Sequence, residues 1–321
     1  MRRNFLRGLA LAFGLAATLA VQAQGSYPDK PVRLVVPFPP GSATDIGARM
    51  VAQQLQATMG QPFVVDNKPG AGGSIGSMDV VRAAPDGYTL LFASNSPAAS
   101  NVALLKNMPY DPARDLTPIA GVGGSMLVLM VRADHPAKNL REFIAHLKQH
   151  PGKVSAGYGS SSSQTSIALL NKLAKVDVLA VPYKGIPLAV TDTIGGVVDF
   201  TFVDLANALP QAKGGKMRAL GVTSSKRAAL VPDWPALSET LPGFDITAWL
   251  AVFGPANMPR QVVEKLNGAI TGVLQQPEVH EKLAATGMQP MVMSPEQLKQ
   301  FVGTEITKWL QLARDANIQP Q

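Results

Sequence analysis

Short apolar runs alternate with amphipathic segments along most of the chain. Three runs in the first hundred residues are rich in β-branched side chains and have the length of strands: 32–38, 63–65 and 89–93. Two segments between them carry apolar residues at helical spacing: 46–59 and the region of Val80 and Val81. Near-continuous apolar strands are typical of parallel sheets that are covered on both faces. The β-α-β-α-β order therefore predicts an α/β fold with a largely parallel sheet.

The same alternation starts again near Ser125. Five further runs have strand character: 126–131, 153–158, 178–181, 198–203 and 217–222. Three segments between them have helical periodicity: 139–149, 164–175 and 188–194. A strand beginning at Trp249 then leads into three helices: 260–274, 278–285 and 295–314. Two successive α/β units in one chain predict two lobes with a cleft between them.

The first 23 residues have the organisation of a secretory signal peptide. A short positive start precedes an apolar stretch at 8–21, and small residues at 21–23 offer a cleavage site. The apolar stretch is shorter than the ~20 residues that span a bilayer, which argues against a membrane anchor. Arg2 and Arg3 also resemble a twin-arginine signal. We therefore expect export to the periplasm by the secretory or the twin-arginine route, with the mature chain starting near Gln24.

Composition removes several kinds of chemistry from consideration. The 321 residues contain no cysteine, which excludes disulfides, thiolate nucleophiles and zinc–thiolate sites. The formal net charge is +7, and Arg2, Arg3 and Arg7 of the predicted signal peptide account for three of these charges. The remaining basic residues are scattered and are not interleaved with aromatic residues, so no nucleic-acid partner is expected.

Motifs for catalysis or cofactor binding are weak. The serines at 157–161 stand in the wrong place for a nucleophile elbow. His146 and His150 can share a helix face but lack the glutamate of a zinc-protease motif. The glycine-rich loop at 70–76 follows the second predicted strand, and no P-loop lysine comes after it. We therefore expect no catalytic residue, no metal and no cofactor.

Glycines and neutral hydrogen-bonding residues follow most of the predicted strands. In open α/β sheets, ligands bind outside the carboxyl ends of the strands, so these positions are candidate binding residues. Where a helix begins, unpaired N–H groups and the helix dipole favour an anion such as a carboxylate. Hydroxyl groups there can donate or accept hydrogen bonds. The candidates are Gly41, Ser42, Ser94, Asn95, Ser96, Ser160, Ser161, Ser162, Ser163, Tyr183, Lys184, Gly185 and Asp204.

Each candidate also has a purely structural interpretation. Ser42 and the serines at 160–163 can cap helices, and Asp204 can be a turn residue. Ser42 and Asp45 have the spacing of a capping box, in which Asp45 would stabilise the helix start instead of touching a ligand. The recurrence of such residues at several strand ends, rather than any single residue, indicates a binding site for a small carboxylate-bearing molecule.

Several motifs, taken together and in chain order, resemble one protein family. They are YPDKP at 27–31, VPFPPGSATD at 36–45, NKPGAGGSIG at 67–76, APDGYTL at 84–90, PYDP at 109–112, VPYKG at 181–185 and GPA at 254–256. The sequence resembles the receptor component of tripartite tricarboxylate transporters, the Bug-type extracytoplasmic solute receptors. The resemblance covers essentially the whole mature chain. It departs from the family pattern at Ser42, where a second glycine often follows the first.

The resemblance implies an α/β fold of the periplasmic-binding-protein type, with two α/β lobes, a hinge and a ligand cleft between the lobes. Residues 26–124 plus 248–321 would form one lobe, and residues 125–247 the other. In the family, the loop matching 38–45 and the loop matching 160–163 face each other and hold a ligand carboxylate. This adds Phe38, Ala43 and Asp45 to the candidate residues. The loops at 94–96 and 183–185, with Asp204, would complete the pocket.

The function that these features predict is capture of a small solute, an organic acid or a related molecule, by closure of the two lobes. The resemblance implies delivery to a separate two-part membrane permease, and we expect a monomer. A ligand sensor that signals to a membrane kinase stays open as an alternative, and an enzyme acting in the cleft is a further one. The sequence leaves the solute open among dicarboxylates, tricarboxylates, amino acids, aromatic acids and neutral amides or vitamins.

Overall fold

The computed structural model describes residues 27–320, so the predicted signal peptide lies outside the described residues. Ten strands are described, in the pairing order β2-β1-β3-β9-β4-β7-β5-β6, and β8 and β10 also pair with β4. Their bounds are β1 (Val32–Val36), β2 (Phe63–Asn67), β3 (Thr89–Ser94), β4 (Leu116–Arg132), β5 (Val154–Tyr158), β6 (Val178–Pro182), β7 (Phe200–Asp204), β8 (Met217–Val222), β9 (Thr247–Pro255) and β10 (Gln289–Pro290).

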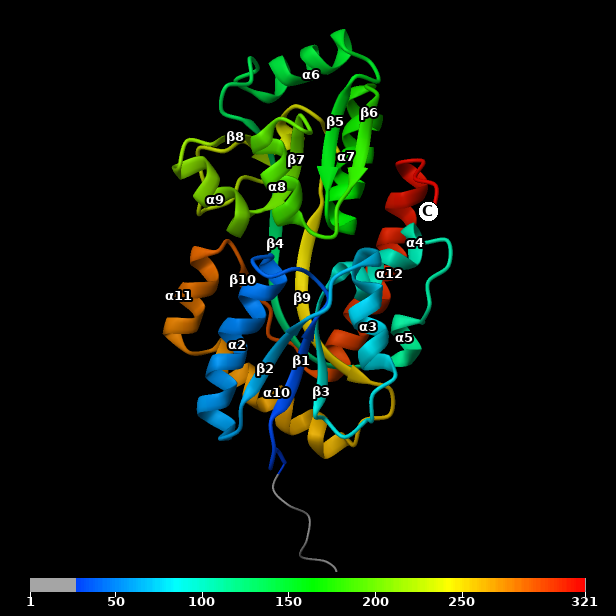
Figure 1. Cartoon of the computed structure of the whole chain (residues 1–321), viewed down its shortest axis with the longest axis vertical. Helices are drawn as coiled ribbons and strands as arrows, with labels where there is room; N and C mark the ends of the chain where they lie inside the picture. The colour runs from blue at the N-terminus through cyan, green and yellow to red at the C-terminus, as the bar shows by residue number, and fades with distance from the viewer. Residues whose placement is uncertain (1–26, 321) are drawn as a thin grey trace, which may run out of the picture.

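The elements form two groups along the long axis of the molecule, which we call lobe 1 and lobe 2 (Figure 1). Lobe 1 contains β1, β2, β3, β9 and β10, and its helices are α2 (Ala43–Met59), α3 (Ser74–Val81), α4 (Asn101–Leu104), α5 (Pro112–Asp115), α10 (Arg260–Leu274), α11 (Pro277–Ala285) and α12 (Pro295–Asp315). Lobe 2 contains β5 to β8 and α6 (Leu140–Gln149), α7 (Ser161–Ala174), α8 (Ile186–Gly195) and α9 (Leu205–Lys213). Short helical turns are η1 (Ala71–Gly73), η2 (Ser96–Ser100) and η3 (Leu237–Glu239).

The long strand β4 belongs to both lobes. It pairs with β9 from Leu116 to Met126 and then with β7 and β8 from Leu127 onward. The apolar pattern predicts only the second half of this strand, because the first half contains Pro118 and three glycines, which have low strand propensity. Pairing with β9, with two shifts of register, holds this first half extended.

The predicted parallel sheet is correct only for the outer strands. β1 pairs in parallel with β2 and β3, and β5 pairs in parallel with β6 and β7. The central strands β4 and β9 run antiparallel to every partner they have in the described chain. The difference arises because the chain passes between the lobes on these two strands and therefore meets its neighbours in the opposite direction.

Helix α2 shows how the sequence builds the region next to the cleft. Ser42 caps its start, and Gly60 ends it with a positive φ of 74°. Ala48, Val51 and Leu55 are buried at helical spacing and pack with the side chains of β1, which is itself almost entirely buried. The tight packing of helix on strand fixes where the loop between them, residues 37–42, can lie.

The C-terminal helix α12 is attached to β9 through one buried carboxylate. Glu305 is 5% exposed and accepts hydrogen bonds from the indole nitrogens of Trp249, at 2.7 Å, and Trp309, at 3.1 Å. A buried carboxylate is tolerated where such donors surround it. The end of α12 also reaches lobe 2, where Lys172 donates to the carbonyl of Asp315. Among residues 27–320, no helix combines the length and apolar character needed to cross a bilayer.

Candidate functional site

A pocket lies between the two lobes, with an empty volume of about 460 Å³ that is partly open to solvent. Lobe 1 and the adjoining part of β9 contribute Phe38, Ser42, Ala43, Thr44, Ser94, Asn95, Ala248 and Leu250. Lobe 2 contributes Gly159, Ser160, Ser162, Ile186 and Asp204, and β4 contributes Leu127. The lining therefore combines two helix starts, hydroxyl and amide groups, and a set of apolar side chains.

Half of the predicted site residues line this pocket. They are Phe38, Ser42, Ala43, Ser94, Asn95, Ser160, Ser162 and Asp204. The lining also includes residues that were not predicted: Thr44, Leu127, Gly159, Ile186, Ala248 and Leu250. Thr44 and Gly159 are next to predicted residues in the sequence and could have been included for that reason. The other four are apolar: Leu127, Ile186, Ala248 and Leu250. Nothing in the sequence distinguishes them from core residues, because an apolar residue in or beside a strand can face either the core or a pocket.

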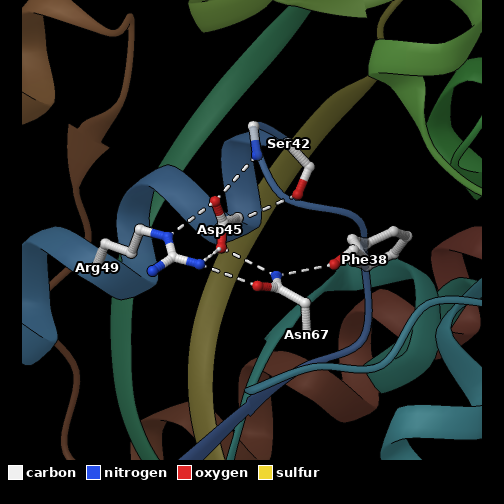
Figure 2. A network of polar contacts seen from close by, with 6 residues as sticks. Phe38, Ser42, Asp45, Arg49 and Asn67 are labelled. Carbon is white, nitrogen blue, oxygen red and sulfur yellow. Dashed lines mark hydrogen bonds and ion pairs between the residues drawn. The ribbon is translucent and has the colours of Figure 1, made fainter. Parts of the chain in front are cut away.

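Asp45 holds the loop at 37–42 in place through hydrogen bonds (Figure 2). Its carboxylate accepts the N–H of Gly41 at 2.9 Å, Arg49 Nε at 3.1 Å and Asn67 Nδ2 at 2.9 Å. Asn67 in turn donates to the carbonyl of Phe38 at 3.0 Å. Asp45 is only 3% exposed and is absent from the pocket lining, so its contacts support the helix-start interpretation.

The predicted capping box at the start of α2 forms only in part. The hydroxyl of Ser42 accepts the N–H of Asp45 at 3.3 Å, as a capping residue does. The carboxylate of Asp45 reaches back to the N–H of Gly41, however, and the N–H of Ser42 donates to Pro39 instead. Gly41 adopts a positive φ of 80°, which glycine takes without steric cost, and this turns the chain into the helix.

Burial alone would raise the pKa of the Asp45 carboxyl. Hydrogen bonds from Arg49, Gly41 and Asn67, together with the charge of Arg49, outweigh burial and hold this pKa below its ordinary value of 3.8. A carboxyl whose pKa falls on folding stabilises the folded state above the unfolded pKa. This contribution disappears as the pH falls through the lowered value.

Substitution of Asp45 by alanine is expected to lower the free energy of unfolding by about 1–3 kcal/mol, because it leaves buried donors without an acceptor. Asp45→Asn keeps one acceptor oxygen and should cost less. Arg49→Ala removes a side chain that is 54% exposed and should cost least. Urea denaturation at pH 7 and below pH 4 would measure this order. An equal loss of stability in Asp45→Ala and Arg49→Ala would contradict the assigned role.

The serine-rich segment lies in the first turn of α7 rather than in a loop before it. Ser160 is the N-cap residue, and its hydroxyl accepts the N–H of Ser163 at 3.2 Å. The hydroxyl of Ser163 accepts the N–H groups of Gly159 and Ser160 in return, at 3.2 and 3.1 Å. Ser163 is thus fully used in stabilising the helix start, and the prediction that the helix begins at residue 164 was three residues late.

Hydrogen bonds connect the start of α7 directly to lobe 1. The N–H of Ser161 donates to Ser96 Oγ at 3.1 Å, and the Ser161 hydroxyl donates to Asn101 Oδ1 at 2.6 Å. Asn95 Nδ2 donates to Ser162 Oγ at 3.0 Å. All five residues are almost completely buried. The structure therefore places Ser96 and Ser161 in the contact between the lobes, away from the pocket lining.

The 183–185 segment lies beside the pocket. Tyr183 and Lys184 line a neighbouring crevice with Ser161, and this crevice shares Gly159 and Ser160 with the main pocket. The Tyr183 hydroxyl donates to Asp192 at 2.7 Å. Burial, this hydrogen bond and the charge of Asp192 raise the pKa of Tyr183 to about 12.

Gly185 faces the other lobe at close range. A Cβ atom at this position would lie only 2.7 Å from Pro39 Cγ and even closer to Pro39 Cδ. Its φ is 179°, so the backbone itself does not require glycine. The absence of a side chain is needed for space, because Pro39 of lobe 1 occupies it.

Asp204 is the one residue with an ionisable side chain in the described lining. It ends β7, caps α9 and is 6% exposed. Its carboxylate accepts the backbone N–H and the side-chain amide of Asn207, at 2.9–3.0 Å. Burial raises the pKa of this carboxyl, against the opposing effect of the hydrogen bonds from Asn207. No lysine, arginine or histidine belongs to the described lining.

The arrangement suits binding of an anion by neutral groups. α2 and α7, from opposite lobes, both begin at the pocket, and each helix start carries a partial positive charge. Within residues 27–320, His, Asp and Glu side chains form no group of three that could hold a metal ion. The site offers hydrogen-bond donors and a favourable field for a small carboxylate.

Comparison with known proteins places the chain in a family. The family model described as the tripartite tricarboxylate transporter family receptor matches residues 47–318. Protein BugT of Bordetella pertussis is 36% identical over 321 residues, covering 97% of this chain and 98% of BugT. These two matches confirm the family resemblance of the sequence.

Solved structures confirm the fold. Rpa4515 of R. palustris with adipate has a TM-score of 0.90 and 32% identity, covering 92% of this chain and 100% of that chain. MatC from Rhodopseudomonas palustris with bound malate has a TM-score of 0.84 and 34% identity, covering 89% of this chain and 99% of that one. The predicted fold class, two α/β lobes of the periplasmic-binding-protein type, is correct. The chain belongs to the tripartite tricarboxylate transporter receptor family, as a Bug-type solute-binding receptor.

Proposed function

We propose that the protein captures a small carboxylate-bearing solute in the periplasm, in the pocket between its lobes, and delivers it to a two-part membrane permease. The observation that carries this proposal is the convergence of two helix starts, from opposite lobes, on one pocket. The adipate and malate in the two related structures support a carboxylate as the ligand. Binding without chemical conversion is supported by the relatives, which are described as a transporter receptor family and as a periplasmic binding protein.

Capture proceeds by closure of the lobes around the solute. The two lobes, 26–124 with 248–321 and 125–247, move as units, and the connections near 124–125 and 247–248 act as the hinge. The hydrogen bonds of Ser161 and Asn95 across the lobe contact support this, because they form only when the lobes are together. The solute favours the closed state to the extent that it contacts both lobes at once.

A bulky side chain in the pocket is expected to abolish binding. Ala43 lines the pocket at the first position of α2, and its replacement by leucine fills the space without altering the hydrogen bonds of the loop. Ala57 lies on the same helix and is exposed, so Ala57→Leu is the matched control. Thermal denaturation with C4 to C6 dicarboxylates, hydroxy acids and amino acids would measure the effect, since a ligand that binds the folded state raises its melting temperature.

The expected result is a ligand-dependent rise in melting temperature for the unmodified protein and for Ala57→Leu, and none for Ala43→Leu. A rise that persists in Ala43→Leu would mean that the solute binds elsewhere. Turnover of the bound compound by the purified protein would contradict the transport function and favour a cleft enzyme.

A further inference from the structure

Asp204 is an acidic residue in a position where structure alone requires none. Its place at the start of α9 needs a hydrogen-bond acceptor, and a neutral side chain can serve, as Ser42 and Asn139 do for α2 and α6. No cation contacts its carboxylate in the described chain; the side-chain partner is the neutral amide of Asn207. A buried, uncompensated carboxylate destabilises a fold, so a neutral cap would be the more stable choice.

Asn207 does not use every acceptor position of the carboxylate. Oδ1 accepts two hydrogen bonds from Asn207, whereas Oδ2 accepts one, and each carboxylate oxygen can accept two. Asp204 belongs to the pocket lining. Among the described residues, the backbone N–H of Asp204 itself is the other group that acts on this carboxylate. No other side chain competes for it, so a donor from a molecule in the pocket can take the remaining position on Oδ2.

The rest of the lining decides what such a molecule must contain. The starts of α2 and α7 and their hydroxyls suit one carboxylate. Phe38, Leu127, Ile186 and Leu250 suit an apolar body. A second ionised carboxylate would meet Asp204 with the same charge and without any basic side chain in the described lining to offset the repulsion.

We propose that Asp204 selects solutes that carry a hydrogen-bond donor, best an ammonium group, in addition to one carboxylate, and that it disfavours unsubstituted dicarboxylates. The inference rests on the proposed function, because it assumes that the pocket holds the solute. It names amino acids as the preferred class and hydroxy acids as the weaker one, since a charged donor gives the stronger hydrogen bond to a carboxylate.

Four probes with the same five-carbon skeleton test the proposal: pentanoate, 2-aminopentanoate, 5-aminopentanoate and glutarate. Titration calorimetry of the full mature chain at pH 7 would measure their affinities, with shorter and longer homologues of each included. At least one amino acid is expected to bind more tightly than the monocarboxylate and dicarboxylate of the same length.

Asp204→Asn is the decisive variant, because asparagine is also a preferred helix cap. Amino-acid binding should weaken by about tenfold to a hundredfold, the range that loss of a hydrogen bond to a charged group produces, while dicarboxylate binding strengthens. The melting temperature without ligand should stay the same or rise, which separates lost recognition from misfolding. Asp111→Asn is the matched control, since Asp111 caps α5, is exposed and lies outside the pocket lining.

Two results would overturn the proposal, and a third would reach further. Glutarate or its homologues could bind most tightly to the unmodified protein, or Asp204→Asn could keep the preference for amino acids. Either result would remove Asp204 as the selecting residue while leaving the proposed function intact. If no probe of any length or class binds, the proposed function for this pocket fails together with the inference.

Discussion

Alanine in place of Gly185 is expected to weaken solute binding by roughly tenfold to a hundredfold without unfolding either lobe. The added Cβ would overlap Pro39 of lobe 1, whose ring is rigid and cannot turn aside. Overpacking of this kind costs about 1–3 kcal/mol, and here the cost applies only when the lobes come together. The substitution therefore acts on the equilibrium between the open and closed forms.

Gly195→Ala is the matched control, because a Cβ at Gly195, at the end of the same helix, meets no atom within 4 Å. Calorimetry would give the affinities, and small-angle scattering with saturating solute would show whether Gly185→Ala stays more extended. Equal affinity in the two variants would mean that the approach of Gly185 to Pro39 is not needed for binding.

Gly159→Ala is expected to cause a larger and different loss, a decrease in the free energy of unfolding of about 3 kcal/mol, at the upper end of overpacking effects. A Cβ at this position would overlap the carbonyl carbon of Gly185 and the nitrogen of Ile186 and would lie 2.6 Å from Gly185 O. These are backbone atoms of the same lobe, so no change of side-chain rotamer can relieve the overlap. The pocket, which Gly159 and Ile186 both line, should be distorted as well.

Denaturant unfolding without ligand distinguishes the two glycine substitutions, because only Gly159→Ala should shift the transition. Gly303→Ala is the control for a glycine-to-alanine substitution that causes no overlap. Gly303 is exposed within α12 and has open space around it, so alanine there should stabilise the protein by about 1 kcal/mol. A Gly159→Ala protein as stable as the parent would show that the strand–helix corner can rearrange freely.

The order of strands and helices could be predicted from the sequence because most of them are short and strongly patterned. α10 lies at 260–274, as its periodicity predicts. The direction of the central strands could not be predicted, because an apolar run has the same appearance in a parallel and an antiparallel pair. The first half of β4 was hidden for a related reason: its glycines and Pro118 have low propensity, and only tertiary pairing with β9 makes them a strand.

The candidate site was predictable as a set of loops but not as a set of side-chain roles. The rule that ligands bind beyond strand ends led to Ser42, Asn95, Ser160 and Asp204, all of which line the pocket. The rule cannot distinguish a hydroxyl that faces the pocket from one that faces the helix or the other lobe. Ser163 is an example, because rotation of a fraction of a helical turn separates it from Ser162, which does line the pocket.

The two faces of strand β9 contact different parts of the molecule. Ala248 and Leu250 line the pocket, whereas Trp249 between them donates to Glu305 of α12. A slip of one residue in its pairing would exchange the faces. The indole of Trp249 would then fill the pocket, and the buried Glu305 would lose its donor from β9 and keep that of Trp309. The hydrogen bond between β9 and the C-terminal helix thus helps to fix the pairing register of the strand that lines the binding pocket.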